Sequence, residues 1–298
     1  MKLKSSLTAD LSLLLVACIW GSTFVIVQKA IQFMPPHFFN GVRFFLAALL
    51  VALIGRKMTR LVPTKRSIAA GVTLGVFLFL GYAFQTVGLL YTTSSKAGFI
   101  TGLSVMIVPL LSIWILKETA RKTVYAAAAV GTAGLYFLTF SGFSSFNQGD
   151  LLVFCCALAF ALHILFTGKF SGQHDAWLLT IVQLFTVSIL SFSASGLFEN
   201  VPDAGKMLTA DVMLALFITA FFATAFAFFV QTKLQQYTTA SRVALIYASE
   251  PVFAALTAYF FAGERLSSAG IFGCVLILTA MLMAEWKPAR TKESIVSH

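Results

Sequence analysis

Three ionisable side chains fall within long apolar stretches of the sequence, where they could take part in chemistry: Glu250, Arg43 and His163. A charged side chain at the centre of a bilayer costs about 2.5–3.5 kcal/mol on insertion scales, so each needs a function or a structural partner. Glu250 lies near the middle of its stretch, and Pro251 after it removes a helix hydrogen bond. We interpret Glu250 as a carboxylate that binds a proton or a substrate amine, or else as a permanent partner of Arg43 or His163.

Arg43 and His163 each have a structural alternative as well. Arg43 lies about seven residues inside its stretch, roughly 10 Å along a helix, which is deep for an interfacial residue. Its guanidinium could hold a substrate carboxylate, or it could bind backbone carbonyls and snorkel outward. His163 could relay protons near neutral pH, or it could be a packed neutral histidine.

Other polar and aromatic side chains in these stretches could contact a solute, although contacts between helices are their alternative role. The neutral polar candidates are Ser22, Asn40, Gln85, Tyr91, Gln183 and Tyr247. Trp20 and Phe24 are four residues apart, on one face of a helix, and could offer an aromatic wall to an amine.

Lys96 and Arg242 each follow a Thr-Thr-x-Ser string at the expected start of a helix, where the helix dipole disfavours a cation. The cytoplasmic interface would account for Arg242. Lys96, which we expect on the outer side, could instead attract an anionic group.

The composition places these residues in a membrane protein. Of 298 residues, 59% are hydrophobic and only 11% are charged, whereas a soluble domain has about 25% charged residues. The apolar residues form continuous runs rather than the alternating pattern of a barrel strand, and a helix needs about 20 of them to span a bilayer. We predict an all-α membrane protein with ten transmembrane helices, at residues 10–30, 36–55, 68–90, 94–116, 124–140, 150–168, 177–197, 212–230, 241–261 and 269–286.

The basic residues predict the orientation of these helices. With the amino terminus in the cytoplasm, 16 of the 21 Lys and Arg residues fall on the inner side, as the positive-inside rule requires. Both termini are then cytoplasmic in a multi-pass protein of the cell (plasma) membrane. The net charge of +10 is an orientation signal rather than a sign of nucleic-acid binding.

An internal repeat is the strongest pattern in the sequence. Residues 85–96 (QTVGLLYTTSSK) match residues 231–242 (QTKLQQYTTASR) at six of twelve positions, 146 residues apart. The earlier helices align 140 residues apart, with Asp10 facing Asp150 and Trp20 facing Phe160. Because each unit has five helices, the second enters the membrane from the opposite face, which makes an inverted repeat of the kind found in secondary transporters. We predict repeats over residues 8–141 and 149–287 and a short cytoplasmic tail over 288–298. Pro109 and Pro251 do not coincide at this spacing, so the prolines leave open whether the two halves have mirrored hinges.

These features resemble the drug/metabolite transporter superfamily, specifically its ten-helix EamA-type exporters. The resemblance is carried by Trp20-Gly21-Ser22, Arg43 in Gly-Val-Arg-Phe-Phe, Thr101-Gly102-Leu103, Pro109-Leu110-Leu111, Lys117-Glu118, Glu250-Pro251-Val252 and Gly263-Glu264-Arg265. It implies efflux of amino acids, related metabolites or toxic amphiphiles from the cytoplasm, driven by an ion gradient.

The sequence lacks the motifs of the main alternatives. It has no His-Glu-x-x-His, nucleophile elbow or ATP-binding motif, so we expect no enzyme, cofactor or metal. The expected partners are a small organic solute and membrane lipids, without nucleic acid, and a homodimer stays open. The rival interpretations are multidrug-type efflux of amphiphilic cations and a non-transporting structural or sensory membrane protein.

Overall fold

A computed structural model of the chain describes residues 2–58, 62–92, 94–117, 121–139, 147–200, 204–207, 209–262 and 267–285. Within these ranges all regular secondary structure is helical. The elements are α1 (Lys2–Ala30), α2 (Pro36–Met58), α3 (Lys65–Gly88), α4 (Ser94–Gly102), α5 (Ser104–Ile115), α6 (Lys122–Thr139), α7 (Gln148–Phe170), α8 (Ala176–Phe198), α9 (Ala204–Met207), α10 (Ala210–Ala220), the π-helix η1 (Phe221–Phe226), α11 (Ala227–Leu234), the 3-10 helix η2 (Gln235–Tyr237), α12 (Ala240–Tyr247), α13 (Glu250–Ala262) and α14 (Ser268–Glu285). The predicted tail over 288–298 lies outside the described residues.

Six helical stretches among the described residues are long and apolar enough to cross a membrane. They are Leu7–Ala30, Pro36–Met58, Lys65–Gly88, Gln148–Phe170, Ala176–Phe198 and Ala210–Tyr237, with shorter apolar helices at Ile100–Ile115 and Ser268–Met283. Large apolar side chains such as Trp114, Ile189 and Leu282 are exposed on the outer surface, where lipid accepts them without penalty. The all-helical membrane class is therefore supported, while the count of ten spans stays a prediction.

Local hydrogen bonds explain where several helices begin. The Thr64 side chain caps α3 by accepting from the Ser67 backbone N–H at 3.1 Å, and Asn147 caps α7 in the same way with Asp150. α2 takes its cap from a distant segment, because the Glu199 carboxylate accepts from the backbone N–H of His37 at 2.7 Å and of Phe38 at 3.0 Å. These contacts satisfy donors that the first turn of a helix leaves unpaired.

Two of the stretches predicted as continuous spans are broken near their middles. The first breaks at Leu103, between α4 and α5, and the second at Ala248 and Ser249, between α12 and α13. Pro251 explains the second break, because it cannot donate to the carbonyl of Tyr247, the last residue of α12. Leu103 and Ser249 are 146 residues apart, so the breaks fall at equivalent positions of the repeat. The prolines alone do not predict this match, because they do not coincide at the repeat spacing.

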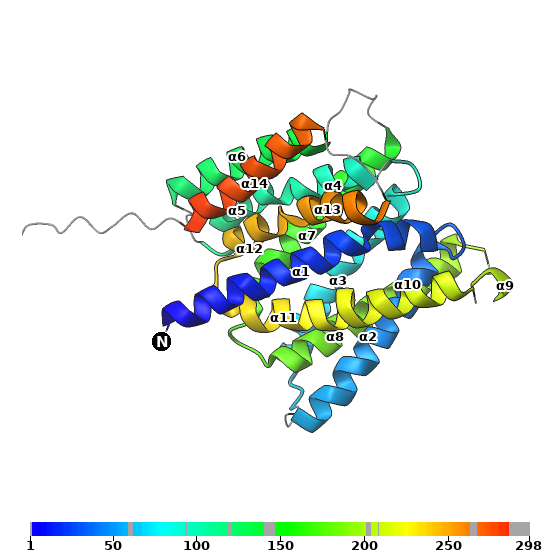
Figure 1. Ribbon diagram of the computed structural model, residues 1–298. Helices are drawn as coiled ribbons and strands as arrows, with labels where there is room; N and C mark the ends of the chain where they lie inside the picture. The colour runs from blue at the N-terminus through cyan, green and yellow to red at the C-terminus, as the bar shows by residue number, and fades with distance from the viewer. Residues whose placement is uncertain are drawn as a thin grey trace, which may run out of the picture.

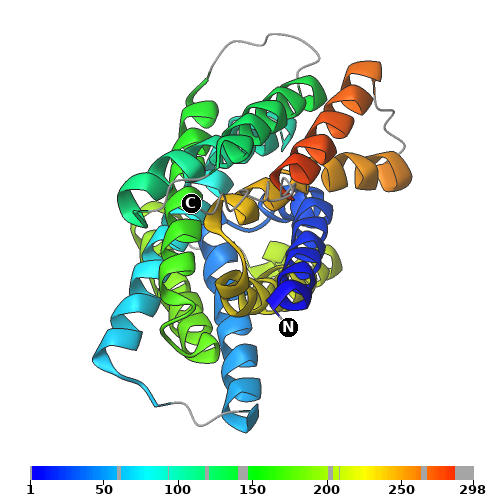
Figure 2. The same ribbon diagram turned by 90° about the vertical axis from the view of Figure 1, so that its left-hand side faces the viewer.

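The helices pack in pairs that join the two halves of the sequence. Figure 1 shows α6 beside α14 at the top of the view, and α2 packs along α8 at the bottom. α3 contacts both α7 and α8, while α1 contacts α13 and α11. In Figure 2 the yellow helix α11 is seen nearly end-on beside the blue α1. The two halves therefore interdigitate and do not form separate domains.

Close approach of α1 and α13 depends on Gly21. A Cβ atom at Gly21 would lie 2.9 Å from the backbone nitrogen of Ala254 and 3.0 Å from the Cβ of Phe253. Small residues permit such contact between helix backbones in membrane proteins. Gly21 thus sets the distance between α1 and the helix that begins with Glu250.

We expect the Gly21→Val variant to push α13 away from α1. Overpacking costs about 1–3 kcal/mol, which corresponds to a fall of about 3–10 °C in the apparent unfolding temperature of a protein of this size. The measurement is thermal unfolding of the purified protein in detergent. Gly196→Val is the matched control, because among the described residues nothing beyond the adjoining backbone of its own helix lies within 4 Å of a Cβ at Gly196. Equal falls for both variants would contradict the role of Gly21.

Candidate functional site

One cavity lies at the centre of the helices, next to both breaks. The centre of a water-sized sphere can move through about 90 Å³ of this cavity. One water needs about 10–15 Å³ by this measure, so the cavity has room for several waters or a small solute. Its walls are formed by Trp20, Thr23, Phe24, Val27, Arg43, Leu78, Tyr82, Gln85, Thr86, Leu89, Gly98, Thr101, Gly102, Ser104, Phe160, His163, Ile164, Phe228, Gln231, Tyr247, Glu250 and Pro251.

Aromatic rings form much of the wall. The Trp20 ring centroid lies 4.9 Å from that of Tyr247 and 5.4 Å from that of Phe228. Tyr82 lies 5.4 Å from Phe160 and 6.1 Å from Phe228. The tilted and edge-on geometries are those that aromatic pairs favour. The predicted partner of Trp20, Phe24, also lines the cavity.

Arg43 reaches the cavity from α2 while fastened to two other helices. Its Nε donates to Thr224 Oγ1 at 2.6 Å, and its Nη2 donates to Tyr82 Oη and to the Ala223 carbonyl, both at 3.4 Å. The guanidinium carbon lies 4.9 Å from the centroid of the Tyr82 ring, within cation–π range. Among the described residues, no carboxylate forms an ion pair with Arg43. Its remaining nitrogen, Nη1, makes no recorded hydrogen bond and belongs to a side chain that lines the cavity.

The π-helix η1 supplies the acceptors for Arg43. The hydroxyl of Thr224 donates to the carbonyl of Thr219, five residues earlier, at 2.8 Å. The Ala223 carbonyl accepts from side chains of two other helices, from Arg43 and also from Trp20 Nε1 at 2.8 Å. Short π-helical segments often occur at functional sites, and this one connects Arg43 and Trp20 to a single carbonyl.

Glu250 begins α13 directly after the break and lines the cavity. The start of a helix is the positive end of its dipole, which stabilises a carboxylate. In the part of the chain that the structure describes, Glu250 has no hydrogen bond or ion pair, so it is paired with neither Arg43 nor His163. A carboxylate in such a place can accept a proton or a cationic ligand.

His163 belongs to a buried hydrogen-bond chain at one side of the cavity. Its Nε2 donates to Gln183 Oε1 at 2.9 Å, and Gln183 Nε2 donates to Thr232 Oγ1 at 2.9 Å. This arrangement joins α7, α8 and α11 and matches the packed-histidine interpretation, although the ring also lines the cavity.

The remaining predicted candidates divide into two groups. Gln85 and Tyr247 line the cavity, with Gln85 Nε2 donating to Thr101 Oγ1 at 3.4 Å. Asn40, Ser22 and Gln183 do not line it and serve contacts between side chains, such as Asn40 Nδ2 to Thr86 Oγ1 at 3.0 Å and Thr257 Oγ1 to Ser22 Oγ at 3.1 Å. Tyr91 is exposed. The side chain of Lys96 lies outside the described residues.

Sequence reasoning missed several residues of the wall, among them Tyr82, Thr101, Ser104, Phe160 and Phe228. A signal for them existed in the repeat. Thr101 and the candidate Tyr247 are 146 residues apart, as are Ser104 and the candidate Glu250, and Phe160 lies 140 residues after the candidate Trp20. Transferring each candidate to its repeat equivalent would therefore have found three of these five.

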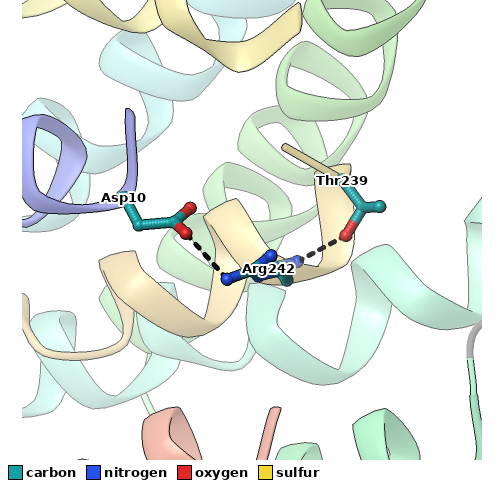
Figure 3. A network of polar contacts seen from close by, with 3 residues as sticks. All are labelled: Asp10, Thr239 and Arg242. Carbon is teal, nitrogen blue, oxygen red and sulfur yellow. Dashed lines mark hydrogen bonds and ion pairs between the residues drawn. The ribbon is translucent and has the colours of Figure 1, made fainter. Parts of the chain in front are cut away.

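Arg242 has a specific partner where only an interface was expected. Its Nη2 lies 2.7 Å from Asp10 Oδ2, and its backbone N–H donates to Thr239 Oγ1 at 3.4 Å (Figure 3). The carboxylate offsets the unfavourable position of a cation in the first turn of α12.

Comparison with known proteins identifies the family. The sequence model of the EamA-like transporter family matches the chain twice, over residues 7–140 and 147–285. This chain belongs to the EamA-like transporter family. The resemblance predicted from the motifs is thereby confirmed, and membership of the EamA-like transporter family favours transport over catalysis.

Relatives across most of the chain carry transporter names. An uncharacterized transporter of Archaeoglobus fulgidus is 39% identical over 279 residues, which is 93% of this chain and 85% of the relative. YoaV of Bacillus subtilis, also described as an uncharacterized transporter, is 26% identical over 95% of this chain and 98% of its own. A "Probable amino-acid metabolite efflux pump" of Salmonella typhimurium is 26% identical over 90% of this chain and 91% of its own.

A solved structure shares the fold of this EamA-like protein. A crystal structure at 20% sequence identity superposes with a TM-score of 0.76 and covers 93% of this chain and 98% of its own. Together with the apolar helices, these relatives establish a multi-pass membrane protein of a transporter family.

We expect the Arg43→Met variant to fold as stably as the native protein, because each main partner of Arg43 keeps another bond. Thr224 still donates to Thr219 and the Ala223 carbonyl still accepts from Trp20, and removing a buried charge that has no ionic partner is often neutral. The apparent unfolding temperature in detergent should change by less than about 2 °C. Arg242→Met is the matched control, and it should lower that temperature further because it removes the ion pair with Asp10. A larger fall for Arg43→Met would show that Arg43 is mainly structural.

Proposed function

We propose that this protein is a secondary active transporter that exports amino acids or related small metabolites across the plasma membrane, coupled to an ion gradient. Ten transmembrane helices form two inverted repeats, over residues 8–141 and 149–287, with a tail over 288–298 and both termini in the cytoplasm. Glu250, a carboxylate without a partner among the described residues at a helix break beside the cavity, carries the proposal.

The pattern of helix contacts supports the inverted repeat. α2 packs on its repeat equivalent α8, and α6 packs on its equivalent α14. α7 is the equivalent of α1, and α10 with α11 is the equivalent of α3, so the contact of α3 with α7 matches that of α1 with α10 and α11. In the same way, the contact of α7 with α4 and α5 matches that of α1 with α12 and α13. Each contact recurs when the two halves are exchanged, as a two-fold axis in the membrane plane requires.

The cavity lies on this pseudo-two-fold axis. Its wall contains the equivalent pairs Trp20 and Phe160, Thr23 and His163, Phe24 and Ile164, Tyr82 and Phe228, Gln85 and Gln231, Thr101 and Tyr247, and Ser104 and Glu250. Transporters with inverted repeats place the substrate site at the interface of the repeats, beside broken helices. The position of the cavity therefore supports its use as the substrate site.

The charges of the wall favour a zwitterion. Arg43 offers an unpartnered nitrogen to a carboxylate, and Glu250 offers a carboxylate to an ammonium group or a proton. The rings of Trp20, Tyr82 and Phe228 suit an apolar substituent between these ends. The Salmonella relative named as an amino-acid metabolite efflux pump supports the same class. Proton binding at Glu250 would couple transport to the proton gradient.

The test is solute counterflow in liposomes with a panel of radiolabelled amino acids and amphiphilic cations. We expect saturable counterflow of amino acids, and a loss of at least about tenfold in proton-driven accumulation for Glu250→Gln, because a charge-assisted contact of this kind accounts for one or two factors of ten. Asp211→Asn is the control, because Asp211 is an exposed carboxylate at the start of α10.

Two outcomes would contradict the proposal. Saturable counterflow of no solute in the panel would exclude transport of these classes. Counterflow of cations alone, unaffected by Arg43→Met, would instead favour multidrug-type efflux.

A further inference from the structure

The two ends of the pathway differ although the repeats are equivalent. Toward the end where α1 finishes, the cavity extends to Val27, Leu89 and Gly98. The repeat equivalents at the other end are Thr167, Gln235 and Ala244, and all three have an exposed fraction of 0%. Leu89 itself is only 6% exposed, so the difference is that the cavity reaches one set of positions and not their repeat equivalents. We call the side that the cavity reaches the open half and the other side the closed half.

One polar contact between helices in the closed half has no counterpart in the open half. Gln235 Nε2 donates to the backbone carbonyl of Ile164 at 2.6 Å, which joins η2 to α7. The equivalent residues in the open half are Leu89 and Phe24, and both line the cavity. Leu89 has no group that could make such a bond, so the contact has no counterpart in the open half.

The closed half contains polar atoms that its packing does not satisfy. Thr167 Oγ1, Ser171 Oγ and Gln231 Oε1 are buried and have no hydrogen-bond partner among the described residues. Ile164, Thr167, Gly168 and Ser171 share one face of α7 by their spacing, and this face meets Gln235. An unpartnered buried polar group is unfavourable, whereas the same group is favourable along a path that fills with water.

The ion pair of Asp10 with Arg242 (Figure 3) lies on the same side of the cavity, because both residues precede cavity-lining positions, Trp20 and Tyr247, on their helices. At the other end the equivalent acid, Asp150, also contacts the segment before a broken helix, through Thr92 Oγ1 at 2.6 Å. Since an acid makes such a contact at both the open and the closed end, the ion pair does not explain the difference between them.

We propose that the surface between α7 and η2, with Ile164, Thr167, Gly168 and Ser171 facing Gln231 and Gln235, is the closed second half of the transport pathway, held shut by the bond from Gln235 to the Ile164 carbonyl. We call this surface the α7–η2 seam. The proposal rests on the proposed transport function and adds the route by which the cavity opens to the other face. In the proposed orientation that face is the cytoplasm.

The first experiment measures labelling of single cysteines in a background with Cys18, Cys155, Cys156 and Cys274 replaced by alanine. A membrane-impermeant maleimide is applied to right-side-out and inverted vesicles that carry Val27→Cys or its repeat equivalent Thr167→Cys. We expect Val27→Cys to react from the outer face and Thr167→Cys to be protected. Adding Gln235→Ala should raise labelling of Thr167→Cys from the inner face and lower labelling of Val27→Cys, each by at least about threefold. The loss of one net hydrogen bond should shift the equilibrium from the form closed at the seam toward the form open there.

Gln236→Ala is the matched control, because Gln236 is the exposed neighbour of Gln235 and donates only to Lys233 within its own turn. If Gln235→Ala fails to fold, Gln235→Glu replaces it, since an ionised carboxylate of similar size cannot donate to the Ile164 carbonyl. Unchanged rates in a folded variant, or a rise at both cysteines, would overturn the proposal. The probe requires no transported solute, so reciprocal labelling without counterflow would refute the proposed substrates and leave the seam standing.

A second experiment closes the seam covalently. A Cβ atom at Gly168 would lie 3.8 Å from the Cβ of Ala240, within the range of about 3.5–4.5 Å that a disulfide needs. In the same background, oxidation of the Gly168→Cys and Ala240→Cys double variant should abolish counterflow of a radiolabelled amino-acid mixture, and dithiothreitol should restore it.

The control disulfide joins Gly131→Cys and Ala280→Cys between α6 and α14, where the corresponding distance is 3.5 Å, and it should leave counterflow unchanged. Counterflow that persists through a fully oxidised seam, in a protein whose reduced form transports, would overturn the proposal while the transport function stands.

Discussion

A polar group buried among apolar helices must find a hydrogen-bond partner, because no water reaches it there, and the centre of this molecule is arranged around that constraint. In the π-helix, the Ala223 carbonyl accepts from both Trp20 and Arg43. Pro251 has no backbone N–H, so it cannot donate the helix hydrogen bond to the carbonyl of Tyr247. The cavity lies at the resulting break before Glu250. Irregular backbone is tolerated at membrane depth only where it is covered by protein or lines a water-filled space, so the cavity and the interrupted helices require each other.

The predicted repeat matches positions that differ in chemistry. Ser104 is matched with Glu250 and Thr23 with His163, while Gln183 is matched with Arg43. The ionisable group of each of these pairs therefore comes from only one member. In transporters with inverted repeats, matched backbones allow the two halves to exchange conformations, whereas a bound solute or proton needs charges at defined places. The proposed transport function would use both the matched backbone positions and these differences between side chains.

Much of the candidate site was predictable, and the reason is energetic. Glu250, Arg43 and His163 stand out in the sequence because an ionisable residue in an apolar stretch is costly and hence rare. The aromatic wall was not predictable in the same way, because 31 Phe and seven Tyr residues are spread over the chain and nothing local separates a wall residue from one that faces lipid. Local propensity gave no sign of the π-helix either, since its stretch is apolar apart from Thr224. The mirrored breaks escaped the sequence because the break at Leu103 lacks a nearby proline that would cause it.

The sequence by itself determined the helical membrane class and the family, because these follow from hydropathy and from residue identities along the chain. It also predicted the pairing of equivalent positions. Only the tertiary structure decided which polar groups meet. It joined Arg43 to Thr224 and Gln235 to Ile164, and among the described residues it gave the Glu250 carboxylate no partner. Such contacts depend on the distance and rotation between helices that are remote in the sequence. Residue sizes at the helix contacts, such as the missing Cβ at Gly21, together set that distance and rotation. The sequence can predict that a charge is buried, but whether that charge is already paired or available to a solute depends on how the helices pack.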